Sequence, residues 1–242
     1  INNKSYTKMK RFGYIIYFLS NFLIAETPFK VGESLKYSAD FNLIRVGQAE
    51  LYVNRLDKIN DLDAYHVTFS ANTTGLADQL FKIRDQIDIW MDKKDFFTHR
   101  LIKNINEGNY SNKVDVKFDY QKSIAKTKTK EISIDFMARD SFSMFYYLRT
   151  IPLDNNEVMS FSSYEGRRIV HYNLQMTGTE IVRTNIGTFK CKVIRPYREG
   201  KNLFKNQGDM QIWISDDSKR LPVKIQIKMK YGSMTLLLKS VS

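Results

Sequence analysis

Cysteine, proline and glycine are scarce in this chain. Its 242 residues include a single cysteine, Cys191, together with four prolines and eleven glycines. A lone cysteine excludes an internal disulfide and a zinc knuckle, because both need several thiols. So little proline and glycine argues against low-complexity linkers. Hydrophobic residues, by contrast, make up 43% of the chain, which is enough to build a sizeable core.

Sequence motifs of catalysis and metal binding are also missing. The chain has neither HExxH nor GxSxG, and its isolated glycines form no phosphate-binding cluster. His66, His99 and His171 lie in separate predicted strands, with no cysteine or carboxylate at ligand spacing. Residues 215–218 lack the spaced ladder of a calcium loop, so we expect their Asp side chains to bond the local backbone. We therefore predict no enzyme activity, no metal site and no cofactor.

Strict alternation of apolar and polar residues is the strongest pattern in the chain. In residues 223–231, Val, Ile, Ile, Met and Tyr alternate with Lys, Gln, Lys and Lys. Neighbouring side chains of a strand leave on opposite faces, so this strand has one apolar and one basic face. Similar segments recur along the chain with polar turns between them. We predict an all-β, mainly antiparallel fold: a single curved sheet or half-barrel of about a dozen strands.

Two segments break the alternation, and both are predicted to be short helices at the concave face of the sheet. They cover residues 75–82 and 140–150, where apolar residues recur at helical spacing; Asp140 is suited to cap the second. Their side chains either pack as ordinary core or line a cavity for an apolar ligand. The candidate lining residues are Leu76, Leu80, Phe81, Phe142, Phe145 and Tyr146.

The second predicted helix carries a charge on its apolar stripe. Arg149 follows the three aromatic candidates at helical spacing. If the stripe is buried against the sheet, the guanidinium is buried with it. A buried unpaired charge is strongly destabilising, so we expect a carboxylate beside Arg149.

The beginning of the chain resembles a secretory signal. A basic stretch precedes an apolar run over residues 12–24, which is too short to cross a bilayer. We predict a leader over residues 1–25, with a signal peptide starting at Met9, and one β domain over residues 26–242. An uncleaved N-terminal anchor is the alternative. Because no cysteine lies directly after the apolar run, where a lipid anchor would be attached, we expect an exported, periplasmic protein that is not a lipoprotein.

Positive charge dominates the composition. The formal net charge is +12, and the basic residues are spread over the polar strand faces rather than clustered. This distribution is typical of a solvated surface, and peripheral contact with an anionic membrane is the alternative. Export argues against nucleic acid as a partner.

Several motifs resemble one family of exported bacterial proteins, DUF3108. They follow in order along the chain: FKVGESLKYS (29–38), VGQAEL (46–51), DSFSMFYYLR (140–149), GTFKC (187–191) and IWISDD with RLPVKI (212–225). The family has no established activity, so this resemblance implies an exported location and a fold. The predicted architecture also resembles the LolA/LolB lipoprotein carriers, in which a curved antiparallel sheet and helices enclose an apolar cavity.

Two functional hypotheses follow. The first is a non-enzymatic periplasmic protein that binds an apolar ligand, such as a lipid or a lipoprotein acyl chain. The second is a cell-envelope scaffold that binds a protein partner, without a small ligand, through an edge strand or the basic face.

Overall fold

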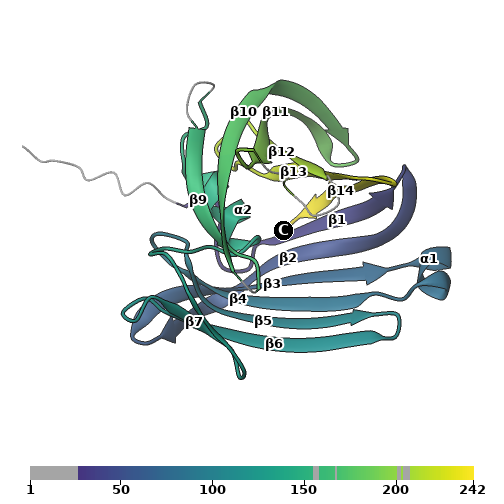
Figure 1. The fold of residues 1–242 in the computed structure, drawn as a ribbon. Helices are drawn as coiled ribbons and strands as arrows, with labels where there is room; N and C mark the ends of the chain where they lie inside the picture. The colour runs from purple at the N-terminus through teal and green to yellow at the C-terminus, as the bar shows by residue number, and fades with distance from the viewer. Residues whose placement is uncertain (1–26, 155–157, 167, 201–202, 204–207) are drawn as a thin grey trace, which may run out of the picture.

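The computed structural model describes residues 27–154, 158–166, 168–200, 203 and 208–242. In them, 14 strands form one antiparallel sheet in the order β8-β7-β6-β5-β4-β3-β2-β1-β14-β13-β12-β11-β10-β9 (Figure 1). The sheet is strongly curved and is not closed into a barrel, which confirms the predicted all-β half-barrel. The predicted leader, with its apolar run, lies outside the described residues.

The sheet consists of two arms, each a series of sequential antiparallel strands. The first arm contains β1 (Ser34–Phe41), β2 (Ile44–Ile59), β3 (Leu62–Thr73), β4 (Arg84–Asp92), β5 (Thr98–Glu107), β6 (Tyr110–Asp119), β7 (Ile124–Lys126) and β8 (Glu131–Ser133). The second contains β9 (Val158–Tyr164), β10 (Ile169–Thr184), β11 (Gly187–Tyr197), β12 (Asp209–Ser215), β13 (Pro222–Met229) and β14 (Gly232–Val241). The arms meet where β1 pairs with β14.

Two helices interrupt the strands. Helix α1 (Gly75–Leu80) connects β3 to β4, and α2 (Ser143–Thr150) lies in the connection between the arms. The first turn before α2 is capped as its sequence suggests: Asp140 Oδ1 accepts the N–H groups of Phe142, at 2.7 Å, and Ser143, at 3.2 Å. The helix itself begins three residues after Asp140.

Successive turns of the central strands lie at opposite ends of the sheet, because neighbouring strands run antiparallel. One end, called the tip end below, carries turns 42–43, 108–109 and 230–231 together with α1. The opposite end, called the mouth end, carries turns 60–61, 93–97 and 216–221. In Figure 1, α1 and the β1–β2 turn lie at the right of the view, whereas α2 lies in the middle.

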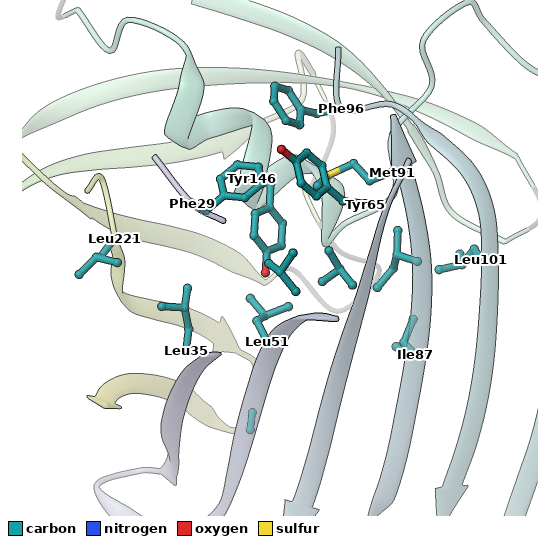
Figure 2. Packing of buried hydrophobic residues seen from close by; sticks show 14 of the residues in the cluster. Phe29, Leu35, Leu51, Tyr65, Ile87, Met91, Phe96, Leu101, Tyr146 and Leu221 are labelled. Atoms are coloured by element: carbon teal, nitrogen blue, oxygen red, sulfur yellow. The ribbon is translucent and has the colours of Figure 1, made fainter. Parts of the chain in front are cut away.

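The concave side of the sheet is filled by α2. Phe145 and Leu148 pack in one buried cluster with strand residues such as Leu174 and Ile212. Tyr146 belongs to the adjoining cluster, where it lies beside Phe29 above the inner face of β1 and β2 (Figure 2). Alternate residues of the central strands supply this face, as period-two alternation requires. The side chains of α2 therefore fill the space enclosed by the curved sheet.

Strand β10 differs from its predicted form. The sequence suggests two strands, over 168–177 and 180–184, but the structure has one strand with a register shift between Met176 and Gly178. Gly178 has a φ of +151°, which favours glycine and permits this bulge. The β10–β11 hairpin then continues past β12 until Asn185 donates to the carbonyl oxygen of Lys239 on β14.

Residues 134–140, called the bridging segment below, connect the two outer parts of the sheet. On one side, the carbonyl oxygen of Ala138 accepts the N–H of Thr98, at 3.0 Å. On the other, Arg139 donates to the carbonyl oxygen of Ser162 and accepts from Tyr164, at 2.9 and 2.8 Å. The outer edge of β9 is thereby paired over a short stretch without closing the barrel.

Candidate functional site

A cleft of about 1850 Å³ opens at the mouth end of the sheet. Aromatic residues and a methionine form much of its wall: Tyr65, Phe96, Phe97, Phe118, Tyr120, Phe136 and Met137. Charged residues of both signs surround them: Asp61, Asp63, Asp92, Asp95, Asp119, Lys58, Lys93, Lys94, Arg149 and Arg220. Five carboxylates face five cations, so the lining carries no formal excess of either sign.

The aromatic wall is a set of rings in mutual contact. Phe97 lies 4.8 Å from Tyr120, centroid to centroid, in an edge-to-face arrangement. Phe136 lies 6.2 Å from Tyr120 and 6.4 Å from Phe97. Phe97 is buried, but Phe136 is 71% exposed. Tyr120 is fixed by its hydroxyl, which lies 2.7 and 3.0 Å from the carbonyl oxygens of Thr98 and Ala138. The inner rings of the wall are therefore held by packing and hydrogen bonds, whereas the Phe136 ring is exposed to solvent at its edge.

A buried ion pair lies at the base of the cleft. The guanidinium of Arg149 donates to both oxygens of Glu33, at 2.5 and 2.9 Å, which confirms the predicted carboxylate partner. Arg149 Nη2 also donates to the carbonyl oxygens of Pro28, at 2.7 Å, and Lys219, at 3.1 Å. One side chain of α2 therefore holds the segment before β1 and the β12–β13 turn.

His99 is the titratable group of greatest chemical interest in the lining. Its Nε2 lies 3.2 Å from Asp92 Oδ2, and its ring packs edge-on against Phe97. Burial lowers the pKa of His99, although Asp92 acts in the opposite direction. Asp92 Oδ1 meanwhile accepts the N–H groups of Lys94 and Asp95. Through Asp92, His99 on β5 is therefore connected to the backbone of the 93–97 turn.

Although no carboxylate lies at ligand spacing in the sequence, each of the three histidines has an Asp beside it in the folded chain. Besides His99, His66 pairs with Asp88 at 3.1 Å, and His171 lies 3.6 Å from Asp135. The His66–Asp88 contact comes from adjacent strands, β3 and β4, and is invisible in sequence spacing. No group of three His, Cys, Asp or Glu side chains in the described part of the chain is arranged to hold a metal ion.

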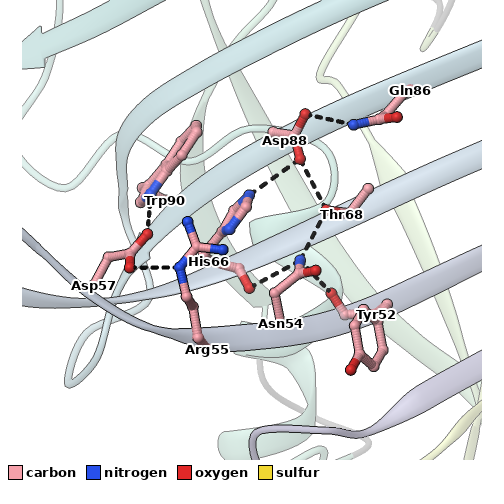
Figure 3. Close-up of polar contacts among 9 residues, drawn as sticks. All are labelled: Tyr52, Asn54, Arg55, Asp57, His66, Thr68, Gln86, Asp88 and Trp90. Carbon is pink, nitrogen blue, oxygen red and sulfur yellow. Dashed lines mark hydrogen bonds and ion pairs between the residues drawn. The ribbon is translucent and has the colours of Figure 1, made fainter.

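The His66 network lies on the polar outer face of the first arm (Figure 3). His66 is stacked on Trp90 with centroids 4.5 Å apart, and Trp90 Nε1 donates to Asp57. Thr68 and His66 both bond Asp88 Oδ1. These contacts link β2, β3 and β4 across the sheet and stiffen it.

The six residues predicted to line a cavity do not come together. Phe145 and Tyr146 are buried in the core, and Phe142 is half-buried against Phe69 at 4.5 Å. The remaining three lie on or directly after α1 and are exposed: Leu76, Leu80 and Phe81. Helix α1 has no buried residue, because it lies beyond the ends of β3 and β4. The concave space of the prediction is occupied by α2 itself.

The aromatic residues of the mouth were not identified from the sequence. Phe96 and Phe97 follow the polar turn 92–95, and Phe136 and Met137 follow the short strand β8. Four large apolar residues in turns and connections, where polar residues normally predominate, were the available signal. Alternation could not find them, because they lie outside the strands.

The acidic turn after β12 is as predicted. Asp217 Oδ1 accepts the Ser215 hydroxyl, at 2.8 Å, and the N–H groups of Lys219 and Arg220, each at 3.0 Å. The carboxylate therefore satisfies the local backbone.

Comparison with known proteins identifies the family. The family described as "Protein of unknown function (DUF3108)" matches residues 36–239. The chain belongs to the DUF3108 family. No curated protein matches it. Among the described residues, no helix of this DUF3108 protein has the length and apolar character needed to cross a membrane.

Two solved structures are similar to this DUF3108 chain. One, from Brucella abortus, is described as a "Beta-barrel-like Protein of Domain of Unknown Function DUF1849". It is 12% identical, with a TM-score of 0.59 over 88% of this chain and 97% of that one. The other, a "putative lipoprotein" from Parabacteroides distasonis, is 12% identical over 88% and 96% of the two chains, with a TM-score of 0.41. The first likeness concerns the fold alone, and the curved sheet is consistent with a LolA/LolB-like architecture.

Proposed function

We propose that this protein is a non-enzymatic, exported protein of the cell envelope that binds an apolar ligand in the mouth cleft. The ligand class is a lipid or a lipoprotein acyl chain. The aromatic wall of the cleft, with Phe136 exposed at its edge, carries the proposal. Phe136, together with the half-buried Tyr120 and Met137, offers a flexible chain apolar area to cover, and the removal of this area from water favours binding. Export is supported by the signal-like sequence over residues 1–25.

The energetics suit an acyl chain. Each methylene removed from water contributes about 0.8 kcal/mol, so several of them against the wall supply a useful binding free energy. The exposed charges around the cleft offer contacts to a headgroup of either sign: Lys93 and Lys94 are cationic, and Asp61 and Asp63 are anionic. The inner rings are already packed against one another, so little side-chain ordering opposes binding.

Native mass spectrometry with oleic acid tests the proposal directly. We expect the wild-type protein to retain oleate, and Phe136→Ser to weaken retention roughly tenfold, equivalent to about 1.4 kcal/mol of lost apolar contact. Phe81→Ser is the matched control, since Phe81 is also exposed but lies at the tip end. It should leave oleate binding unchanged.

Two results would overturn this function. One is a wild-type protein that retains no oleate. The other is an equal effect of the Phe136 and Phe81 substitutions, which would indicate nonspecific surface adsorption. Recovery of one envelope protein without lipid would instead support the scaffold hypothesis.

A further inference from the structure

The tip end carries a concentration of exposed apolar side chains. Leu43 is 99% exposed in the β1–β2 turn, Leu80 is 86% exposed at the end of α1, and Tyr231 is 81% exposed in the β13–β14 turn. Others exposed at the same end are Ile44, Leu76, Phe81, Tyr110 and Met229. Met229 and Tyr231 belong to the apolar face predicted for residues 223–231. They lie past the buried part of this face, so their side chains are exposed. Apolar side chains gathered in this way usually mark an interaction surface.

The four tips form one continuous surface. Asn42 in the β1–β2 turn exchanges backbone and side-chain hydrogen bonds with Ser233, directly after the β13–β14 turn. Thr74, just before α1, donates its N–H to the carbonyl oxygen of Val46 on β2. Gly108 in the β5–β6 turn donates to Lys82. The tips are therefore neighbours in the order β13–β14, β1–β2, α1, β5–β6.

Helix α1 is held firmly while its leucines face outward. Arg84 forms a bidentate ion pair with Asp78, at 2.6 and 2.9 Å, and this pair lowers the pKa of Asp78 to about 2. Thr73 donates its hydroxyl to Asp78 and accepts the N–H of Ile83, at 2.6 and 2.9 Å. The exposure of Leu80 is therefore built into the fold of this connection and does not come from fraying.

Glycine fixes the position of the neighbouring aromatic ring. Gly108 has a φ of +56°, and a Cβ placed there would lie 2.8 Å from Phe81 Cε2. A side chain at this position would displace the ring from the β5–β6 turn. The ring of Phe81 thus continues the apolar surface from α1 to the neighbouring tip.

Positive charge accompanies the apolar side chains. Lys82, Lys228 and Lys230 are exposed at the tips and form no ion pair among the described residues. The nearby carboxylates are accounted for differently: Asp40 and Asp78 are paired with arginines, and Asp85 and Glu107 are half-buried. Burial and Asp85 raise the pKa of Glu107. Three exposed lysines, unpaired in the described part of the chain, thus outnumber the two half-buried carboxylates, which leaves a small cationic excess at the tips.

We infer that the tip end docks the protein onto an anionic membrane surface. Exposed leucine and aromatic side chains enter the headgroup region, and the three lysines face anionic lipids. The lysines favour a membrane over a second copy of this chain, because two copies would bring like charges together. Membrane docking and ligand binding use opposite ends of the sheet, so each can fail without the other.

Vesicle co-sedimentation tests this inference. The purified protein is mixed with vesicles of phosphatidylcholine alone or mixed with phosphatidylglycerol, at low and high salt. We expect stronger binding to the anionic vesicles and weaker binding at high salt. Leu80→Glu and Leu43→Glu, on two different tips, should each reduce binding at least fivefold. Leu56→Glu is the matched control: Leu56 is 44% exposed on β2 toward the mouth end, so binding should be unchanged.

Several results would overturn the inference. Equal binding to both vesicle types would do so, as would equal losses in Leu56→Glu and Leu80→Glu. Dimerisation that Leu80→Glu abolishes, without vesicle binding, would assign the surface to a second copy. The inference is supported if the two variants affect different assays. Phe136→Ser should impair oleate retention but not vesicle binding, and Leu80→Glu should impair vesicle binding but not oleate retention. Thermal melts of each variant check that the fold is intact.

Discussion

At the residue scale, the buried ion pair of Arg149 and Glu33 connects three parts of the molecule. Its charges are removed from water, and hydrogen bonds from Arg149 to two backbone carbonyls satisfy further donors. Replacing such a pair by well-packed apolar residues is often neutral or stabilising, whereas removing one partner alone is strongly destabilising. The guanidinium also lies 5.2 Å from the centre of the Phe29 ring, so the pair fixes the aromatic cluster at the base of the cleft.

Arg149→Met should destabilise the protein by about 3–5 kcal/mol, because it leaves the Glu33 carboxylate buried without a partner. Urea unfolding measures the loss. Adding Glu33→Met should restore much of the stability, since the unpaired charge is then gone. A double variant that is as unstable as the single one would show that lost packing, rather than charge, dominates.

His99 gives the stability of the protein a predictable dependence on pH. Burial holds its pKa in the folded state below the ordinary value of 6.5. At a pH between the lowered pKa of the folded state and the ordinary pKa of the unfolded state, the unfolded chain binds more protons than the folded one. The free energy of unfolding therefore falls as the pH drops below about 6.5. Urea unfolding at about pH 7.5 and about pH 5.5 should show a smaller loss for His99→Asn than for the wild type. An equal loss in both proteins would contradict this assignment.

At the element scale, α2 shows what can be deduced from a sequence. Its helical spacing predicts the buried face, and the rule against unpaired buried charge predicts a carboxylate beside Arg149. The identity of that carboxylate could not be predicted, because Glu33 lies 116 positions away in sequence. Helix α1 has equally clear spacing but no opposing surface, so the same pattern gives exposed leucines. Periodicity shows that a face is apolar; only tertiary structure shows what covers it.

Phe145→Ala tests whether α2 is core or ligand lining. Phe145 is buried among packed side chains, so the change should cost about 3–5 kcal/mol of stability. Oleate retention by the folded variant should be unchanged. Thermal or urea unfolding combined with native mass spectrometry measures both effects. A small stability loss with impaired retention would place the ligand beneath α2 instead of in the mouth cleft.

At the scale of the whole molecule, alternation predicts most strands but not the segment that connects the two outer parts of the sheet. The bridging segment has no alternation of its own, and its contacts with β5 and β9 depend on the curvature of the sheet. Arg139 holds it in place: Nη2 donates to the carbonyl oxygen of Asp95, at 2.7 Å, and the guanidinium lies 3.7 Å from the Tyr147 ring centre.

Arg139→Ala should loosen the bridging segment. The lost hydrogen bonds contribute about 0.5–1.5 kcal/mol each, so the fold should survive while the segment opens more often. Hydrogen exchange should accelerate at the amides of residue 139 and Tyr164. The unpaired β9 edge should then promote self-association, measured by size-exclusion chromatography. Unchanged exchange at these amides would show that backbone contacts alone hold the segment.

The pairing of β1 with β14 also has consequences for the order of folding. Every other pair of neighbouring strands in the described sheet is consecutive in sequence. Each arm can therefore form by the sequential addition of short hairpins. Pairing Leu35 with Val241 instead closes a loop of most of the chain, and the entropy of closing a loop rises with its length. The central seam of the finished sheet is therefore expected to form last, after both arms exist. Until then, the backbone groups at the facing edges of β1 and β14 are unpaired. Aggregation of the folding chain through these edges is therefore expected to be most probable at this stage.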